Sequence, residues 1–376
     1  MISERARKLD FSSYLVDTHS DALAWPTRHQ VDIGVRQDGK TQQDLPRMRE
    51  GNMNIQFFAA FPAPQWIEKK MVIQTVLRYF DSFYTLCRNY PDQIEQARTV
   101  ADAKRIVASG RIAGILCIEG GHAIEDDLAV LRMYYELGAR YMTLTWNNSN
   151  NWADGVLAEP KHNGLTDFGR EVVREMNRLG MIVDISHVAP KTFWDAIETT
   201  SKPVIASHSS CKAICGAPRN MDDNQLRAVK QNGGVVGVNF ERTFVSERYR
   251  LAKLPLDEQR TAALKAAEQA NGGKGEAFEA AKKKINEEYK SKTEELQPPH
   301  WKEIVDHIDH MVEVMGVDHV GIGSDFDGAD MPEGMEDCSK MPLLTQEMLD
   351  RGYSEGDVKK ILGENTLRVM TQVFGG

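Results

Sequence analysis

The chain has 376 residues, of which 41% are hydrophobic and 27% are charged, and its formal net charge is −9. That apolar share can build a large buried core and excludes global disorder. The acidic excess, without any basic stripe, argues against nucleic-acid binding, because proteins that bind nucleic acids neutralise phosphates with Lys and Arg. No apolar run approaches the roughly 18 residues of a membrane-spanning helix, and neither a signal peptide nor a lipid-anchor signal is visible. We therefore expect a soluble protein without a membrane anchor.

Short apolar segments recur along the chain, and each is followed by polar or glycine-rich residues and then by a helical pattern. Eight such segments are present: Tyr14–His19, Met53–Ala59, Ile112–Glu119, Tyr141–Trp146, Met181–His187, Pro203–His208, Val235–Phe240 and His319–Asp325. Their nearly continuous apolar character is typical of strands that are buried on both faces of a parallel sheet.

The segments between these strands have apolar residues three and four positions apart, which predicts helices. Clear examples are Lys69–Asn89, Asp126–Leu137, Asp167–Leu179, Pro190–Thr200, Asn224–Asn232 and Lys302–Met315. Eight strands that alternate with helices predict an α/β fold, namely a (β/α)8 TIM barrel. A doubly wound open sheet is the alternative for the same alternation.

One segment interrupts the alternation between the seventh and eighth strands. Residues 246–299 are rich in Ala, Lys, Glu and Gln, and contain Gly272-Gly-Lys-Gly275 near their middle. This pattern predicts two charged helices joined by a glycine turn, with a solvated surface, although a lid or an oligomer contact stays open. Because no repeat or linker divides the chain, we expect residues 1–376 to form a single barrel domain with a helical insertion at 246–299.

The five cysteines are few, odd in number and scattered, so they do not form a disulfide framework. They favour a reducing, cytoplasmic location, while a periplasmic location would require that a leader had been removed from this sequence. Cys211 and Cys215 could be half of a metal site, but no second Cys or Cys/His pair lies at matching spacing. Buried thiols in a loop are the simpler interpretation.

The ends of the predicted strands carry side chains that can bind metal ions. These side chains are His19 and Asp21 after the first strand, Glu119 after the third, His187 after the fifth, His208 after the sixth and Asp325 after the eighth. In a (β/α)8 barrel all of these ends lie at one face, where the active site is built. Imidazole and carboxylate ligands without thiolate suit zinc with an open position, and manganese or cobalt would also fit.

The spacing of these residues further suggests two neighbouring ions. His19 and Asp21 are two residues apart, so on a strand they face the same side and can chelate one ion. His187 and His208 come from neighbouring strands and can share a second ion. Glu119, with two oxygens, is the natural bridge between ions about 3.5–4 Å apart.

Each of these residues also has a purely structural interpretation. A histidine at a strand end is often a core or loop residue, and His-x-Asp is a common pattern. Glu119, which precedes two glycines, could cap a helix that begins near Ala123. We favour the metal site because the structural interpretations would have to hold at five positions on the same face.

At these positions the sequence resembles the membrane (renal) dipeptidases, zinc peptidases within the amidohydrolase-type barrels. The resemblance covers nearly the whole chain. The motifs that carry it are Asp17-x-His-x-Asp21, Gln56-Phe-Phe, Glu119-Gly-Gly, Asp184-x-Ser-His187, Ser207-His-Ser-Ser, Pro218-Arg-Asn220 and Gly323-Ser-Asp-Phe-Asp-Gly328. Most amidohydrolase-type relatives open with His-x-His, whereas this sequence has His19-x-Asp21, which favours the dipeptidases over the other branches.

The resemblance implies two Zn²⁺ ions per chain. One would be held by His19, Asp21 and Glu119, and the other by Glu119, His187 and His208.

The resemblance also implies a substrate, a dipeptide whose free carboxylate Arg219 would bind. Asp325 would lie beside the water that bridges the ions. Two cations lower the pKa of such a water, so hydroxide can attack the peptide carbonyl while Asp325 passes the proton to the leaving amine.

The sequence departs from this family at Trp146. The family's members carry a histidine at the end of the fourth strand, where it helps to hold the oxyanion and the substrate, and Thr143-Leu-Thr-Trp146 has a tryptophan there. Trp146 has a single N–H and cannot carry a proton charge, so we assign it to substrate binding and expect Asn147, Asn148 or Asn150 to supply a donor.

Two other functions stay open: a barrel hydrolase of another amide, such as a β-lactam, a D-amino-acid conjugate or a cell-wall fragment, and a catalytically weakened metal-binding protein. The intact Asp325 and Arg219 speak against the second of these. A homodimer is also compatible with the resemblance.

Overall fold

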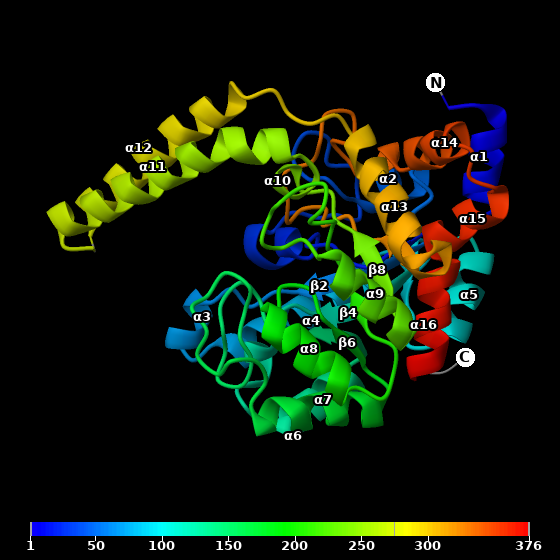
Figure 1. Ribbon diagram of the computed structural model, residues 1–376, viewed down its shortest axis with the longest axis horizontal. Coiled ribbons are helices and arrows are strands. Elements are labelled where there is room, and N and C mark those ends of the chain that lie inside the picture. The colour runs from blue at the N-terminus through cyan, green and yellow to red at the C-terminus, as the bar shows by residue number, and fades with distance from the viewer. Residues whose placement is uncertain (1, 274, 375–376) are drawn as a thin grey trace.

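The computed structural model describes residues 2–273 and 275–374. Its centre is a closed barrel of eight parallel strands surrounded by helices (Figure 1). In order around the barrel these are β1 (Val16–Asp17), β2 (Ile55–Ala60), β4 (Ile112–Ile118), β5 (Ala139–Thr143), β6 (Ile182–Asp184), β7 (Ile205–Ala206), β8 (Val235–Val238) and β9 (Val320–Ile322). The sheet closes because β1 pairs in parallel with both β2 and β9. The predicted (β/α)8 TIM barrel is confirmed, and an open doubly wound sheet is excluded.

Each predicted strand segment overlaps one of these strands, although β2 ends one residue later, at Ala60, and β5 begins two residues earlier, at Ala139. The hydrogen-bonded ladders are shorter than the apolar runs. The β1 ladder ends at Asp17, two residues before His19, and β7 ends at Ala206, two residues before His208. The residues that follow each ladder have left the sheet and lie at the mouth of the barrel, so their side chains are available to the site.

A ninth strand, β3 (Ile94–Gln96), was not predicted from the sequence. It pairs in parallel with the first residues of β4, from Ile112 to Gly114. The segment is three residues long and only Ile94 is buried, so it lacks the apolar run by which the other strands were recognised.

Helices cover the outside of the barrel, and all of the following except the C-terminal α16 lie between successive strands. They are α4 (Val72–Asn89), α5 (Val100–Ala108), α6 (Leu128–Glu136), α7 (Asp167–Leu179), α8 (Pro190–Thr199), α9 (Asp223–Asn232), α13 (Lys302–Met315) and α16 (Asn365–Phe374). Helix α7 shows how the sequence sets their limits. The Thr166 side chain accepts a hydrogen bond from the Gly169 N–H at its start, and Gly180 ends it in the left-handed region at φ +83°.

Shorter helices complete the surface. These are α1 (Glu4–Phe11), α2 (Leu45–Glu50), α3 (Gln65–Glu68), α14 (Pro342–Asp350) and α15 (Glu355–Lys359), with the π-helices η1 (Trp25–His29) and η5 (Lys360–Glu364) and the 3₁₀ turns η2 (Gly121–Ile124), η3 (Val317–His319) and η4 (Cys338–Lys340). Helix α1 packs beside α14, so the N-terminal helix lies against the C-terminal part of the chain (Figure 1).

Alternate strand residues fill the interior of the barrel. Side chains from opposite strands belong to one buried cluster: Val16, Ile55, Phe57, Ala113, Ile115, Tyr141, Ile182, Ile205 and Val235. The ring centroids of Phe57 and Tyr141 are 5.4 Å apart. The barrel is therefore a packed core below its mouth, as parallel barrels are.

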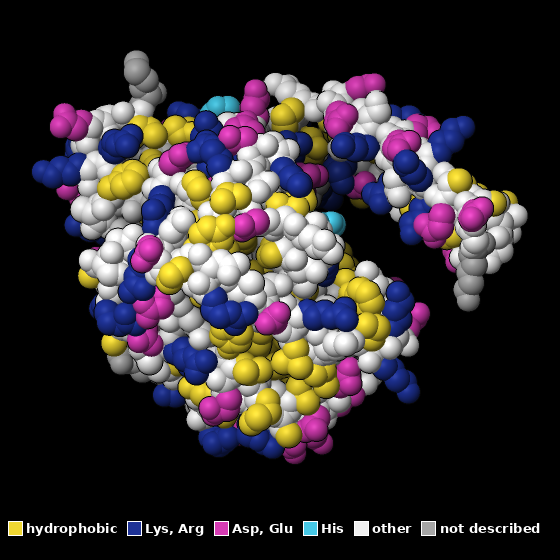
Figure 2. All heavy atoms as spheres, turned by 180° about the vertical axis from the view of Figure 1, so that it is seen from behind, with side chains coloured by type: hydrophobic (Ala, Val, Ile, Leu, Met, Phe, Trp, Pro, Cys, Tyr) yellow, Lys and Arg dark blue, Asp and Glu magenta, His cyan; other side chains and the backbone are white. Residues whose placement is uncertain are grey.

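The predicted insertion forms a long helical arm. After α10 (Arg242–Val245), α11 (Glu247–Asn271) and α12 (Glu276–Glu294) run side by side and project from the body (Figure 1). Only Tyr249 is buried within α11, and no residue is buried within α12. Figure 2 shows the arm standing clear of the body, with both signs of charge mixed over its surface. Among the described residues, no helix has the length and apolar character needed to cross a bilayer.

Candidate metal centre

The mouth of the barrel brings together the residues that sequence analysis selected at the strand ends. Three groups of ligand atoms lie within 4.8 Å of one another: His19 with Asp21 and Glu119, Glu119 with His187 and His208, and His19 with His208 and Asp325. All of these side chains are buried or nearly so. Six residues that span the sequence from 19 to 325 therefore form one continuous cluster.

Glu119 lies between two sets of imidazoles. Its Oε2 is 3.8 Å from His19 Nε2, whereas its Oε1 is 2.9 Å from His187 Nε2 and 3.4 Å from His208 Nε2. The alternative role for Glu119, as the cap of a helix, is wrong. The residues after it form the 3₁₀ turn η2, whose N-cap is Gly120 and which has no side-chain cap.

Each histidine of the cluster is oriented through its Nδ1 atom. His19 Nδ1 lies 2.7 Å from the Tyr141 hydroxyl, His187 Nδ1 lies 2.8 Å from Asn147 Oδ1, and His208 Nδ1 lies 2.7 Å from Ser207 Oγ. The Tyr141 hydroxyl donates to the Thr18 carbonyl, and Ser207 Oγ donates to Asp184 Oδ2, so both oxygens are left to accept from the imidazole. These contacts favour Nδ1–H and turn every Nε2 toward the cluster.

The facing Nε2 atoms are the clearest evidence for a cation. Burial lowers the pKa of both His187 and His208 well below the usual value, so the two rings are neutral. With their protons on Nδ1, they aim two lone pairs at each other across 2.8 Å. That arrangement is repulsive unless a positive ion lies beside it, and an imidazole nitrogen oriented by a partner on its other nitrogen is the usual geometry of a metal ligand.

The first histidine also faces negative charge. His19 Nε2 is buried and has no hydrogen-bond partner in the described part of the chain, and it lies 3.6 Å from Asp21 Oδ2. Burial lowers the pKa of His19, but Glu119, Asp21 and Asp325 outweigh that effect and raise it to about 10. The same carboxylates would favour a divalent cation at this position.

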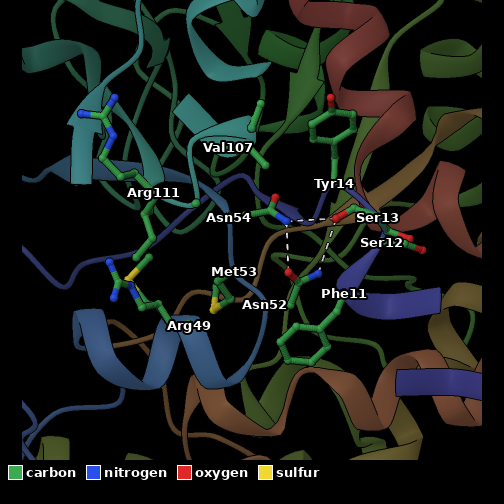
Figure 3. A pocket seen from close by; sticks show the side chains of 14 residues that line it. Phe11, Ser12, Ser13, Tyr14, Arg49, Asn52, Met53, Asn54, Val107 and Arg111 are labelled. Atoms are coloured by element: carbon green, nitrogen blue, oxygen red, sulfur yellow. Dashed lines mark hydrogen bonds between the residues drawn. The ribbon is translucent and has the colours of Figure 1, made fainter. Parts of the chain in front are cut away.

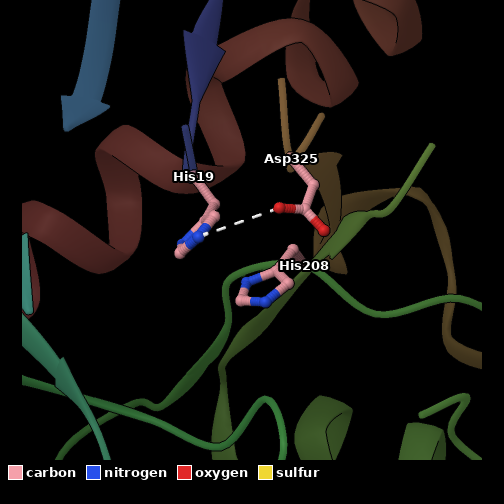
Figure 4. Close-up of side chains that lie close together, drawn as sticks. All are labelled: His19, His208 and Asp325. Atoms are coloured by element: carbon pink, nitrogen blue, oxygen red, sulfur yellow. Dashed lines mark ion pairs between the residues drawn. The ribbon is translucent and has the colours of Figure 1, made fainter. Parts of the chain in front are cut away.

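Asp325 lies at the edge of the cluster (Figure 4). Its Oδ1 is 3.9 Å from His19 Nε2, and its Oδ2 accepts a hydrogen bond from Asn239 Nδ2 at 3.0 Å. Burial raises the pKa of Asp325 to about 7, with Asp21 adding to the rise and His19 opposing it. The carboxyl is therefore held in place by one oxygen while the other faces His19.

The backbone is constrained at the site. His187 and Asp325 have φ angles of +66° and +64°, a region that residues other than glycine seldom occupy. Gly328 leaves the room that the carboxylates need, since a Cβ atom there would lie 2.2 Å from Asp21 Oδ2 and 2.6 Å from Asp325 Oδ1. These constraints are typical of positions where side-chain direction matters more than local backbone preference.

Arg219 is a buried cation beside the cluster. It is 5% exposed; one of its nitrogens donates to the His208 carbonyl at 3.0 Å, while its Nε has no partner among the described residues. Burial lowers the pKa of Arg219 to about 10, and nearby Asp325 and Glu119 oppose that fall. No carboxylate of the described chain forms an ion pair with it.

A cavity of about 380 Å³ opens over the cluster, and Asp21, Glu119, His187, Arg219 and Asp325 line it. Trp146 is part of its wall, with its ring 5.0 Å from that of Phe61 and 6.1 Å from that of His187. Of the asparagines considered after Trp146, Asn147 lines the cavity, whereas Asn150 bonds to the backbone around it.

A larger cavity, of about 540 Å³, lies at the opposite end of the barrel (Figure 3). It is lined by residues that precede β1, β2 and β4, among them Ser13, Asn54 and Arg111. Its polar groups bond to one another, as Asn54 does to the Ser13 carbonyl and to the Leu15 N–H. In this fold conserved chemistry is built at the other face, so we place the functional site at the mouth.

Sequence analysis did not identify the residues that position the candidate metal ligands. Tyr141 lies inside the barrel on β5, and Asn239 follows β8. Asp184 and Ser207 belong to motifs of the family resemblance, but the sequence did not predict a function for either residue. Asn147 follows a predicted strand and had been considered only as a donor to substrate, whereas Asn239 lies within the predicted segment Val235–Phe240, although β8 ends at Val238. Nothing in the pattern around Tyr141 distinguishes it from a core residue.

Comparison with known proteins gives a consistent result. A family model described as membrane dipeptidase (peptidase family M19) matches residues 3–374. The dipeptidase VerJ of Clonostachys rogersoniana is 32% identical over 384 aligned residues, which cover 98% of this chain and 86% of that protein. The probable dipeptidase PvdM from Pseudomonas aeruginosa has a TM-score of 0.82 and 25% identity, covering 98% of each chain. A metallo peptidase from Rhodobacter sphaeroides, liganded with a phosphinate mimic of L-Ala-D-Ala, has a TM-score of 0.77 and 26% identity, covering 96% of this chain and 99% of that one.

Proposed function

The chain belongs to the membrane dipeptidase family, peptidase family M19, and is a metallo-dipeptidase; from this premise we propose that its metal centre holds two zinc ions. His19, Asp21 and Glu119 would hold one ion, and Glu119, His187 and His208 the other. The observation that carries the proposal is the approach of His187 Nε2 to within 2.8 Å of His208 Nε2 and 2.9 Å of Glu119 Oε1. Nitrogen and oxygen ligands without thiolate, with room left for a substrate, suit catalytic zinc.

The residues around the ions would divide the reaction between them. Bound there, two zinc ions lower the pKa of a water molecule and polarise the substrate carbonyl. Asp325 would accept the proton of the attacking water on Oδ1, while Asn239 keeps Oδ2 in place. Asp325 would then give that proton to the leaving amine. One oxygen of this carboxyl is fixed by Asn239 while the other faces His19, which places it to perform both steps.

We assign the binding of the substrate's free carboxylate to Arg219. Its buried guanidinium has no carboxylate partner among the described residues and lines the same cavity as the metal ligands. A planar guanidinium can grip a carboxylate with two parallel hydrogen bonds. The charge of Arg219 would therefore fix the C-terminal end of the dipeptide and set the scissile bond over the cluster.

Trp146 and Asn147 would have separate tasks in this site. The Trp146 ring, beside Phe61, would form an apolar wall against the substrate. Asn147 Oδ1 lies beside His187 Nδ1 and orients the His187 ring. Trp146 cannot transfer a proton, because its indole N–H does not ionise. We therefore assign proton transfer to Asp325.

Metal removal and reconstitution test the proposal. The purified protein is stripped with a chelator, Zn²⁺ is added in steps, and bound metal and hydrolysis of Ala-D-Ala and Ala-L-Ala are followed together. We expect activity to saturate at two ions per chain. Glu119→Gln should lose at least one of them, whereas Glu125→Gln, an exposed neighbour, should behave as the wild type. Saturation at one ion, or full activity in the stripped protein, would overturn the two-zinc assignment.

A further inference from the structure

We propose that Arg28 selects dipeptides whose N-terminal residue has an acidic side chain, an inference that rests on the proposed dipeptidase site. Arg28 lies in η1, after β1, and lines the same cavity as the metal ligands and Arg219. The cavity thus contains two guanidinium groups, while the α-carboxylate of a dipeptide needs only one.

The carboxylates of the cavity are already occupied. Asp21, Glu119 and Asp325 belong to the metal cluster. Asp327 accepts hydrogen bonds from Trp25 Nε1 and from the backbone N–H groups of residues 42 and 43.

Glu241, the remaining acid, caps α10. It accepts from the Thr243 N–H and hydroxyl through Oε1, and from the Asp330 N–H through Oε2. No ion pair links Arg28 to any carboxylate in residues 2–273 or 275–374. Its charge is therefore available to a ligand.

Arg28 is held in position, although it lies at the exposed rim. One Nη donates to the Phe61 carbonyl at 2.7 Å, and the guanidinium carbon lies 5.7 Å and 5.4 Å from the ring centroids of Phe61 and Tyr79. Most of its five N–H groups stay free for a carboxylate. A guanidinium supported by two rings loses less freedom on binding than an unsupported side chain would.

The positions of the two arginines decide which end of the dipeptide Arg28 meets. Arg219 follows β7 and bonds to the His208 carbonyl. Arg28 contacts Phe61, whose ring meets Trp146, and Trp146 stacks near His187. Arg219 therefore contacts the cluster at His208, whereas the shelf formed by Arg28, Phe61 and Trp146 approaches it at His187. With its α-carboxylate on Arg219 and its peptide bond at the cluster, the dipeptide places its first side chain on that shelf.

The test compares isosteric substrates on the zinc-loaded enzyme. We expect kcat/KM for Glu-Ala to exceed that for Gln-Ala by about fivefold, since a guanidinium–carboxylate pair at an exposed rim gains charge-assisted hydrogen bonds that a neutral amide lacks, while solvent screens part of that gain. Arg28→Gln should bring the ratio close to one, and Arg28→Glu should favour Lys-Ala over Glu-Ala. The matched control is Arg78→Gln, which removes the same charge from the exposed face of α4 and should keep the wild-type ratio.

The outcomes separate this inference from the function on which it rests. If no dipeptide is hydrolysed, the proposed site itself fails. If Gln-Ala and Glu-Ala are hydrolysed equally well, or if the preference survives in Arg28→Gln, the role of Arg28 is refuted. A preference for Ala-Glu that Arg28→Gln abolishes would instead refute the placement of the N-terminal residue on the shelf.

Discussion

The role of Asp325 can be tested by the conservative substitution Asp325→Asn. The side chain keeps its size, and its amide oxygen can still accept the hydrogen bond that Asn239 Nδ2 now donates to Oδ2. The substitution removes the negative charge of the carboxylate and its ability to take up a proton. Because Asp21 and Glu119 are assigned as metal ligands, no other carboxylate of the cluster is free to replace it.

The expected loss follows from the size of general-base catalysis. A positioned base typically contributes about 10²–10⁴ in rate, so turnover should fall at least about a hundredfold, or about 2.7 kcal/mol in the activation barrier. Zinc content should stay at the wild-type level. This second measurement is needed because His19, His208 and Asp325 also lie close enough together to share an ion.

The assay measures kcat on a dipeptide and metal per chain on the same samples. Asp330→Asn is the control, because it removes the same charge from an exposed position in the same loop. Turnover within about tenfold of the wild type would refute the general-base role. Loss of zinc together with turnover would refute it in a different way, because Asp325 would then be a ligand.

Three further predictions concern the metal ligands, the core and the arm. Asn147→Ala removes the acceptor of His187 Nδ1, so the zinc Kd, measured by competition with a chromophoric chelator, should rise about 10–100-fold; an unchanged Kd would contradict the positioning role. Burial raises the pKa of Asp10 to about 6 in the fold, against 3.8 for the ordinary side chain. The stability that this shift supplies is complete below pH 3.8 and is lost as pH rises through 6. The free energy of unfolding, measured with urea, should therefore fall by about 1.4 kcal/mol more for the wild type than for Asp10→Asn between pH 5 and pH 8. A parallel pH response of the two proteins would contradict this prediction. Because α11 and α12 bury only Tyr249, replacing residues 252–295 with a short Gly/Ser linker should change Tm by no more than about 3 °C; a larger drop would show that the arm supports the body.

The sequence was sufficient to predict the barrel, because its evidence is local. Each strand is an apolar run and each helix has its own periodicity, and both can be read without knowing the neighbours. Where the local signal was weak, the prediction failed: β3 has three residues and only Ile94 is buried. The arm was likewise predictable from the charged composition and central glycines of 246–299.

The candidate metal ligands were predictable for a topological reason. In a parallel barrel every strand ends at the same face, so His19, Glu119, His187, His208 and Asp325 could be brought together without any distance being known. The positioning partners could not be predicted in this way. Tyr141 reaches His19 across 122 positions of sequence, and such a contact depends on which strands are neighbours in the closed sheet.

The sequence by itself determined the kind of chemistry at the barrel mouth, since residue type and strand order fix which side chains arrive there. Only the tertiary structure decided how each one is used. In the folded chain Glu119 lies between the imidazoles and does not cap a helix. The Nδ1 atoms of His187 and His208 each contact an oxygen, which directs their Nε2 atoms into the cluster. The tertiary structure also left Arg28 without an ion pair to any carboxylate in the described part of the chain. These outcomes depend on the angles and distances at which different strands and loops meet, and no segment of the chain encodes them alone.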